Sequence, residues 1–376
     1  MPLLTRMRQL RAIDYPLLLS VTALLVVGLI MVYSASFGLD MSEGRPTTFY
    51  LVRQLEWVGL GTVGLVVMAL IDYGTWQRFA EPILGAALVI LVVLLLLPGG
   101  EQQAQRWLLG NSVQPSEIVK LAVIIYISAW LASKGEKIRR VTYGMVPFAV
   151  ILGVVTGLIV LQPNFSTALL IVTTAVGMLF VAGADIVQML IGGVVGGVSL
   201  GILVRISPYR WNRVLTFITD PLRDPLGRGY QTARAIFALQ AGGLTGVGLG
   251  GSAQKMGLLY APHTDAIFAI IGEELGLLGC LLVIALYGVL AYRGLQIARR
   301  CREPFGALLA TGITGAIVLQ AALHMAVVTA TVPFTGITLP LISFGGSSLV
   351  ATMAAVGLLL SVSRGPAVAQ VEAGAR

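Results

Sequence analysis

The sequence contains repeated apolar runs of about 20 residues, the length that an α-helix needs to cross the hydrocarbon core of a membrane. The chain is 57% hydrophobic and only 11% charged, whereas a soluble domain carries about 25% charged residues. We therefore expect an all-α polytopic membrane protein. The 45 glycines fit this class because small residues let membrane helices approach closely.

The runs predict ten spans in one transmembrane domain, 1–376. A re-entrant break near Gln162, Pro163 and Asn164 is the alternative interpretation of the fifth and sixth spans. The first run, 15–33, is too long for the apolar region of a signal peptide and is interpreted as the first span. The expected limits are 14–36, 49–71, 80–97, 115–133, 144–162, 166–183, 186–206, 266–292, 305–332 and 346–363.

Basic residues predict the orientation of these spans. The short connections on one side hold only Arg45, Arg53 and Arg106. By the positive-inside rule, the richer side and both termini lie in the cytoplasm, and parity places a large loop, 207–265, outside. The richer side holds Arg6, Arg8, Arg11, Arg78, Lys134, Lys137, Arg139, Arg140, Arg293, Arg299, Arg300, Arg302, Arg364 and Arg376.

The net charge of +8 does not indicate nucleic acid, because no basic run is interleaved with aromatic residues. The two histidines, His263 and His324, and the two cysteines, Cys280 and Cys301, have no metal-ligand spacing. The sequence therefore predicts neither a nucleic-acid partner nor a metal site built from these residues.

The polar stretch 228–276 concentrates the charged residues that can do chemistry. Asp265 opens the eighth span. As a structural residue it would cap the helix, because Asp accepts backbone N–H bonds at a helix start. As a chemical residue it would accept a proton from a substrate hydroxyl beside a basic loop. The two interpretations are compatible, since a cap fixes the orientation of the carboxylate.

Other ionisable residues lie within the predicted spans. Glu273 and Glu274 follow Asp265 by about 12 to 13 Å along the helix axis, and adjacent residues diverge too far to face one partner. Glu117 and Lys120 share one helix face. Acids at this depth require a partner or water, so each is either a structural pair or part of a hydrated cavity.

Two irregular segments complete the set of candidates. A glycine-rich loop, 242–251, precedes Ser252, Gln254 and Lys255 and can present N–H groups to phosphate, with a flexible turn as the alternative. The segment 339–348 breaks helix with proline and paired glycines, which suggests a cavity wall or close helix packing. Loop arginines suit phosphate through their planar fork or bind lipid headgroups; they are Arg210, Arg213, Arg223, Arg228 and Arg234.

Several separated motifs, in the same order, resemble the SEDS family (shape, elongation, division and sporulation; FtsW, RodA and SpoVE), and its FtsW branch more than its RodA branch. Here Asn164 and Ser166 replace the usual Asp and Gly, and Ala266 replaces an aromatic. The motifs are Met31 to Ser36, Arg106-Trp107, Gln114-Pro115-Ser116-Glu117 with Lys120, Gln162 to Ala168, Gly250 to Lys255, His263-Thr264-Asp265, Ile270 to Gly276, and Ile342 to Ser348.

The resemblance implies a peptidoglycan glycosyltransferase that polymerises lipid II outside the bacterial cytoplasmic membrane, with a role in cell division. Asp265 would be the general base on the acceptor hydroxyl, the reaction would invert the donor carbon, and a lipid pyrophosphate would leave. Metal dependence stays open, with Mg²⁺ or Mn²⁺ as the candidate cation. The implied substrate-binding residues are Ser252, Gln254, Lys255, Arg213, Arg228, Glu117, Lys120, Trp107, Ser347 and Ser348.

The resemblance also implies partners: lipid II, the growing glycan strand, a class B penicillin-binding protein that crosslinks strands, and other division proteins in the membrane. Two alternative functions remain. A lipid II transporter would use the charged residues within the spans, although the sequence shows no inverted halves. A scaffold of the division machinery would bind partners without catalysis.

Overall fold

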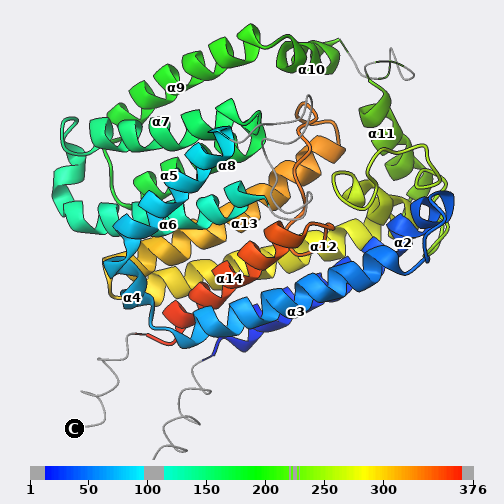
Figure 1. Cartoon of the computed structure of the whole chain (residues 1–376), viewed down its shortest axis with the longest axis horizontal. Helices are drawn as coiled ribbons and strands as arrows, with labels where there is room; N and C mark the ends of the chain where they lie inside the picture. Colours follow the sequence, from blue (N-terminus) through cyan, green and yellow to red (C-terminus); the bar gives the residue numbers. More distant parts are fainter. Residues whose placement is uncertain (1–12, 97–113, 220–221, 223–226, 228, 366–376) are drawn as a thin grey trace, which may run out of the picture.

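The computed structural model describes residues 13–96, 114–219, 222, 227 and 229–365, and within them it is helical, without strands (Figure 1). Trp107 and Arg228 lie outside these residues. The helices are α2 (Tyr15–Ser42), α3 (Phe49–Leu70), α4 (Tyr73–Arg78), α5 (Ala80–Leu96), α6 (Pro115–Lys134), η2 (Gly135–Arg139), α7 (Met145–Leu161), α8 (Phe165–Val181), α9 (Ile186–Ile206), α10 (Pro208–Ile218), α11 (Tyr230–Gly242), α12 (Ile267–Arg300), α13 (Pro304–Val328) and α14 (Gly346–Ser363).

The predicted fold class is confirmed. Each predicted span corresponds to one apolar helix, and seven of the described helices are long and apolar enough to cross a membrane. The other three, α5, α7 and α8, are apolar but have 17 residues each, or about 26 Å at 1.5 Å per residue. The chain is a multi-pass helical membrane protein; the count of ten crossings stays a prediction.

The helical break predicted near residue 163 is present and its polar groups are buried. α7 ends at Leu161 and α8 begins at Phe165. The Gln162 side chain donates to the Leu91 carbonyl at 2.9 Å, and the Asn164 amide donates to the Ser116 hydroxyl at 3.0 Å. Because buried polar groups are costly without partners, these bonds allow the chain to reverse beside α5 and α6.

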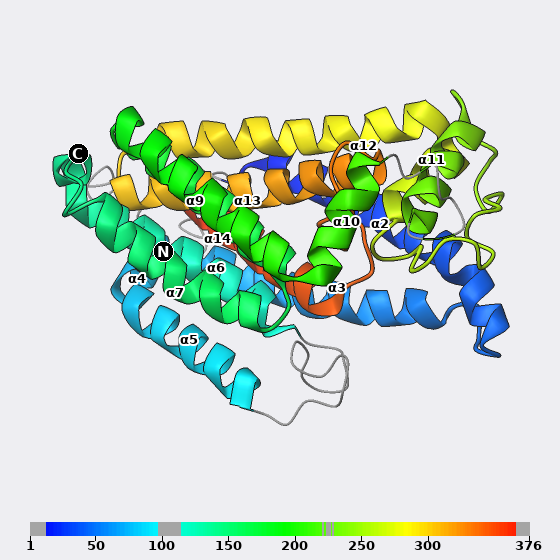
Figure 2. The same cartoon turned by 90° about the horizontal axis from the view of Figure 1, so that it is seen from above.

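The core lies around α12, α13 and α14, with α2 and α3 packed against them (Figure 1). α14 is 83% buried over its apolar window, whereas α9 has no buried residue. Figure 2 shows α9 and α10 on the outside of this bundle. α9 is held only near its two ends, where Gln188 donates to the Arg139 carbonyl at 2.6 Å and α10 follows Ser207.

Hydrogen bonds between distant connections show which of them share an end of the bundle. We call one the Asp265 end; among the described residues it contains 43–48, 162–164, 207–219, 229–266 and 329–345. The opposite end contains 71–79, 135–144, 182–185 and 301–303. Bonds at the Asp265 end join Phe344 to His263 and Ser166 to Thr335, and those at the opposite end join Tyr73 to Glu303 and Arg293 to Asp14.

The eighth apolar helix is longer than predicted and is broken near one end. α12 has 34 residues, or about 51 Å, against a hydrocarbon core of about 30 Å. Gly276 interrupts it with φ 67° and ψ −163°. The hydropathy pattern missed the extra length because polar residues end a hydrophobic run but do not end a helix.

The glycine-rich loop 242–251 fills the break in α12. The N–H groups of Val247 and Gly248 donate to the carbonyls of Glu273 and Glu274 at 2.9 and 3.0 Å, and the N–H of Leu277 donates to Gly243 at 2.9 Å. These bonds satisfy backbone groups that the break leaves without helical partners. The N–H groups of Val247 and Gly248 are therefore hydrogen-bonded to the backbone of α12.

Gly276→Ala is expected to destabilise the protein by about 2–4 kcal/mol, through left-handed backbone strain and overpacking. A Cβ at this position would lie 2.6 Å from the Leu244 carbonyl oxygen. Thermal unfolding in detergent measures the effect. The matched control is Gly288→Ala on the same helix, where a Cβ meets nothing within 4 Å; a similar loss in both variants would contradict the argument.

Candidate active site

Asp265 lies in the turn before α12 and is partly buried. The prediction that it caps the helix is wrong, because the cap residue is Ala266 and no side chain bonds the first turn. The carboxylate instead faces Gly336, where a Cβ would lie 3.1 Å from Oδ2. The helix therefore leaves the Asp265 carboxylate free for chemistry.

Arg213 of α10 is the cation that acts on Asp265. Burial raises the pKa of the Asp265 carboxyl, and the Arg213 guanidinium and the Thr264 hydroxyl oppose that rise. Arg213 donates to the Phe334 carbonyl at 3.0 Å and to the Tyr209 hydroxyl, and it stacks over both rings. A carboxylate with a raised pKa within the field of a cation is suited to act as a general base.

The two residues before Asp265 are fixed to the connection between α13 and α14. The His263 carbonyl accepts from the N–H of Phe344 at 2.9 Å, and the Thr264 carbonyl accepts from the Ser343 hydroxyl at 2.7 Å. The His263 ring packs 4.5 Å from that of Tyr50, and burial lowers its pKa to about 4. His263 is therefore neutral and acts as an anchor for the turn that carries Asp265.

Lys255, predicted to bind substrate phosphate, is enclosed by protein. Its ammonium lies 2.7 Å from the Glu274 carboxylate and 3.0 Å from the Ser34 hydroxyl, and its side chain is 1% exposed. Glu274 also accepts from Ser34 at 2.7 Å. The pair joins α2 and α12 to the loop before Asp265, and its charge is neutralised within the fold.

Glu273 holds the same loop through a different set of contacts. Its carboxylate accepts from the Ser252 hydroxyl, from the N–H of Ala253 at 2.9 Å and from the N–H of Gln254 at 3.4 Å. The expectation that Glu273 and Glu274 face different partners is confirmed. Ser252 is buried as well, so Ser252 and Lys255 both shape the loop from inside.

Glu117 and Lys120 form the structural pair that the sequence offered as one interpretation. Lys120 donates to the Glu117 carboxylate at 2.9 Å and to the Gln320 side-chain oxygen Oε1 at 2.6 Å, and the Gln320 side-chain amide donates to the Thr338 backbone carbonyl at 3.0 Å. Thr338 in turn contacts the Ser348 hydroxyl at 3.3 Å. Ser347 accepts from the Gln114 N–H at 3.0 Å.

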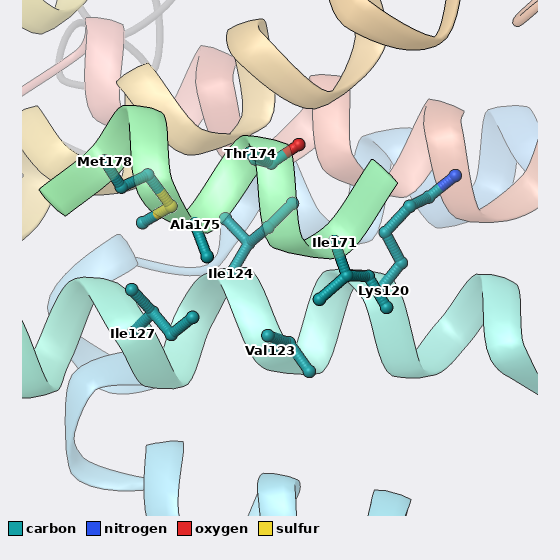
Figure 3. Close-up of a pocket in the computed structure, with 8 residues that line it drawn as sticks. All are labelled: Lys120, Val123, Ile124, Ile127, Ile171, Thr174, Ala175 and Met178. Carbon is teal, nitrogen blue, oxygen red and sulfur yellow. The ribbon is translucent and has the colours of Figure 1, made fainter. Parts of the chain in front are cut away.

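The internal cavities beside Lys120 are too small for a lipid or a sugar. Figure 3 shows one of them between α6 and α8, with Lys120 at one end and apolar side chains such as Ile124 and Met178 along it. Its volume admits about one water molecule.

Some residues of this site were missed by the sequence analysis. Gln320 and His324 are polar residues within an apolar run, which is a signal for a buried contact. Ser34 and Gly336 gave no such signal, because a serine or a glycine is ordinary in a membrane helix or a turn. Across the described residues, no group of three or more His, Cys, Asp or Glu side chains is placed to hold a metal ion.

Comparisons with known proteins identify the family of this chain. The profile of a family described as "Cell cycle protein", FtsW/RodA/SpoVE, matches residues 15–366. A protein named "Probable peptidoglycan glycosyltransferase FtsW" from Trichlorobacter lovleyi is 38% identical over 356 residues, 94% of this chain and 93% of its own length. "Stage V sporulation protein E" from Bacillus subtilis is 39% identical, covering 93% and 97%.

Solved structures share the fold. A chain described under "Structural coordination of polymerization and crosslinking by a peptidoglycan synthase complex" superposes with a TM-score of 0.76 at 29% identity, covering 94% of this chain and 98% of that one. The rod shape determining protein RodA of Thermus thermophilus gives 0.69 at 28% identity, covering 94% and 97%. The fold and the site thus define a multi-pass membrane protein with the Asp265 carboxylate at one end of a helical bundle. The chain belongs to the FtsW/RodA/SpoVE family.

Proposed function

We propose that this protein is a peptidoglycan glycosyltransferase that polymerises lipid II into glycan strands. The relative from Trichlorobacter lovleyi named above carries this activity in its name. The observation that carries the proposal is the Asp265 carboxylate, which is partly exposed, unused by α12 and influenced by the positive charge of Arg213. A carboxylate within the field of a cation suits a reaction that removes a proton from a hydroxyl and releases a pyrophosphate.

In the proposed reaction, Asp265 accepts the proton of the acceptor sugar hydroxyl as its oxygen attacks the donor carbon. The bond from that carbon to the lipid pyrophosphate breaks in the same displacement, so configuration inverts and no sugar-enzyme bond forms. Proton transfer by a positioned base contributes about 10²–10⁴-fold. A raised pKa makes Asp265 a stronger base than an exposed aspartate.

The negative charge on the leaving pyrophosphate requires a cation. Arg213 is the predicted phosphate ligand that acts on Asp265, and its planar fork suits phosphate oxygens. Lys255 is paired with Glu274, so we assign it to the support of the loop. A requirement for Mg²⁺ or Mn²⁺ stays a prediction, and polymerisation with and without a chelator tests it.

We also propose a membrane location and protein partners for this chain. The positive-inside pattern supports cytoplasmic termini and an outer location for the Asp265 end in a bacterial cytoplasmic membrane. A solved relative comes from a peptidoglycan synthase complex of polymerisation and crosslinking, which supports a class B penicillin-binding protein as the partner. The similarity to proteins named FtsW supports a role in division with other membrane proteins.

The direct test supplies lipid II to the purified protein in detergent or vesicles. We expect glycan strands longer than the dimer and release of polyprenyl pyrophosphate. Lipid II moved between leaflets without polymerisation would favour the transporter. Partner binding without polymerisation by the complex would favour the scaffold. The charged residues that motivate a transporter, Glu117, Lys120, Glu273 and Glu274, all have protein partners, which weakens that alternative.

Arg213→Gln is expected to move the acid limb of the pH profile of kcat/KM to higher pH. Arg213 lowers the pKa of Asp265, so its removal raises that pKa, and the base becomes protonated at a higher pH. The rate at neutral pH falls by up to about 10²-fold, because a cation near the leaving group is also lost. Arg213→Lys keeps the charge and should shift the acid limb of the pH profile less. The same acid limb in the unaltered protein, Arg213→Gln and Arg213→Lys would contradict this role.

A further inference from the structure

The connection between α13 and α14 contains a short segment, 334–338, that faces Asp265. Gly336, in its middle, is exposed and has a φ of 60°. A Cβ on Gly336 would lie 3.1 Å from the Asp265 carboxylate oxygen Oδ2, closer than side-chain atoms normally approach. Glycine is therefore required here for two reasons: the left-handed backbone and the space taken by the carboxylate.

Side chains from three helices hold this segment by its carbonyl groups. Arg213 of α10 donates to Phe334 at 3.0 Å, and Ser166 of α8 donates to Thr335 at 2.8 Å. From α13, the His324 ring nitrogen Nδ1 contacts the Ile337 carbonyl at 2.6 Å, and Gln320 donates to Thr338 at 3.0 Å. Four of the five carbonyls are thus bound by side chains, and the remaining one belongs to Gly336.

Buried polar side chains of α6 and α13 connect to this segment through hydrogen bonds. The Gln320 side-chain oxygen accepts from Lys120, which is paired with Glu117, so Glu117 and Lys120 of α6 orient the amide that holds Thr338. His324 is buried, and within the described residues its Nε2 has no partner. Among the described residues the ring therefore has one hydrogen bond, and that bond is to the segment that contains Gly336.

We propose that the 334–338 segment positions the catalytic carboxylate, with Gly336 as the residue that sets where the Asp265 oxygen lies. In this arrangement Ser166, Gln320 and His324 are positioning residues that act through the segment. This inference rests on the proposed function, because it assigns these residues a part in the reaction of Asp265. The exposed Gly336 backbone leaves the carboxylate open on one side for the acceptor hydroxyl.

Gly336→Ala tests the proposal in the full-length protein with lipid II as the substrate. The added Cβ must displace the carboxylate by a few tenths of an ångström, and we expect kcat to fall about tenfold with KM unchanged within about twofold, since small misplacements of a reacting group are costly. The methyl group also shields the carboxylate from water, so the acid limb of the pH profile should move to higher pH.

The matched control is Gly183→Ala, in the turn before α9 at the opposite end. Gly183 has a φ of 84° and nothing within 4 Å of an added Cβ, so this variant carries the backbone strain without the contact. We expect its kcat and pH profile to match those of the unaltered protein. Equal losses in the two variants, or an unchanged kcat and pH limb in Gly336→Ala, would overturn the proposal.

A second pair of variants tests the support if Gly336→Ala fails to fold. His324→Leu removes the contact to Ile337 and is expected to lower kcat about fivefold to tenfold. His324→Asn keeps an N–H donor near the position of Nδ1 and should recover part of that loss. Equal activity in the two variants would overturn the positioning role.

The proposed function and the positioning role of the 334–338 segment can be disproved separately. If the unaltered protein, alone and with its partner, makes no strands from lipid II, the proposed function fails. If it makes strands and Asp265→Asn stops it, while the Gly336 and His324 variants behave like the controls, only the positioning role fails.

Discussion

Asp265→Asn is expected to reduce the rate of glycan-strand formation by about 10²–10⁴-fold, the contribution of a positioned general base. The amide has the size of the carboxyl group and cannot accept the hydroxyl proton. Binding of lipid II should change little, because the loss concerns the transition state. Single-turnover polymerisation with labelled lipid II measures the effect.

The same substitution should stabilise the fold at neutral pH. Burial raises the pKa of Asp265 above its value in the unfolded chain. The stability that the protonated form supplies is complete below the unfolded pKa and is lost as pH rises through the folded pKa. At neutral pH the ionised carboxylate therefore weakens the fold, and asparagine removes that cost. We expect Asp265→Asn to melt at a higher temperature than the unaltered protein at pH 7. The difference between their melting temperatures should be smaller in acid.

Asp185→Asn is the control for both effects. Asp185 precedes α9 at the opposite end, and its side chain accepts from the N–H of Gln188 at 3.1 Å, a bond that asparagine retains. Activity and melting temperature should stay close to those of the unaltered protein. Normal polymerisation by Asp265→Asn would remove Asp265 from the mechanism.

Breaking the buried pair of Lys255 and Glu274 is expected to cost about 3–5 kcal/mol of stability, because the remaining charge stays buried without its partner. The two side chains are 1% and 0% exposed. Lys255→Met leaves the Glu274 carboxylate with only the Ser34 hydroxyl as a partner. Glu274→Gln leaves the Lys255 ammonium without a carboxylate partner. Thermal unfolding in detergent, followed by recovery of monodisperse protein, measures each loss.

The double variant Lys255→Met with Glu274→Gln separates pairing from charge. It removes both charges, so its stability should lie well above that of either single variant. Glu43→Gln is a further control, because Glu43 pairs with Arg45 at 2.8 Å on the surface, with side chains 38% and 43% exposed; exposed pairs contribute about 0–1 kcal/mol. A double variant as unstable as the singles would contradict a pairing role.

The sequence predicted the helices well because hydropathy is a local property. Each apolar run became a helix, and the polar break at Gln162 to Asn164 separated α7 from α8. Some limits were wrong: α12 continues beyond the apolar run to Arg300, whereas α13 ends at Val328, before the predicted limit of 332. The fold class and the family could therefore be predicted from local patterns along the sequence.

The candidate site was predicted less completely, because its contacts join distant parts of the chain. Lys255 pairs with Glu274 across the loop and with Ser34 of the first helix, 221 residues away. The motif placed Lys255 near phosphate, but its position in the fold engages it with a carboxylate. Gly336 is 71 residues from Asp265, and only the folded backbone brings the two together.

The absence of buried residues in α9 bears on how this segment can change over evolutionary time. Its valines, leucines and isoleucines face lipid, where one aliphatic side chain serves as well as another. Mutational drift among aliphatic residues should therefore be freest in α9 and most restricted in α14, where nearly every side chain has neighbours on all sides. Homologous sequences would show that contrast as rapid exchange at 186–206 and near-invariance of side-chain volume at 346–363.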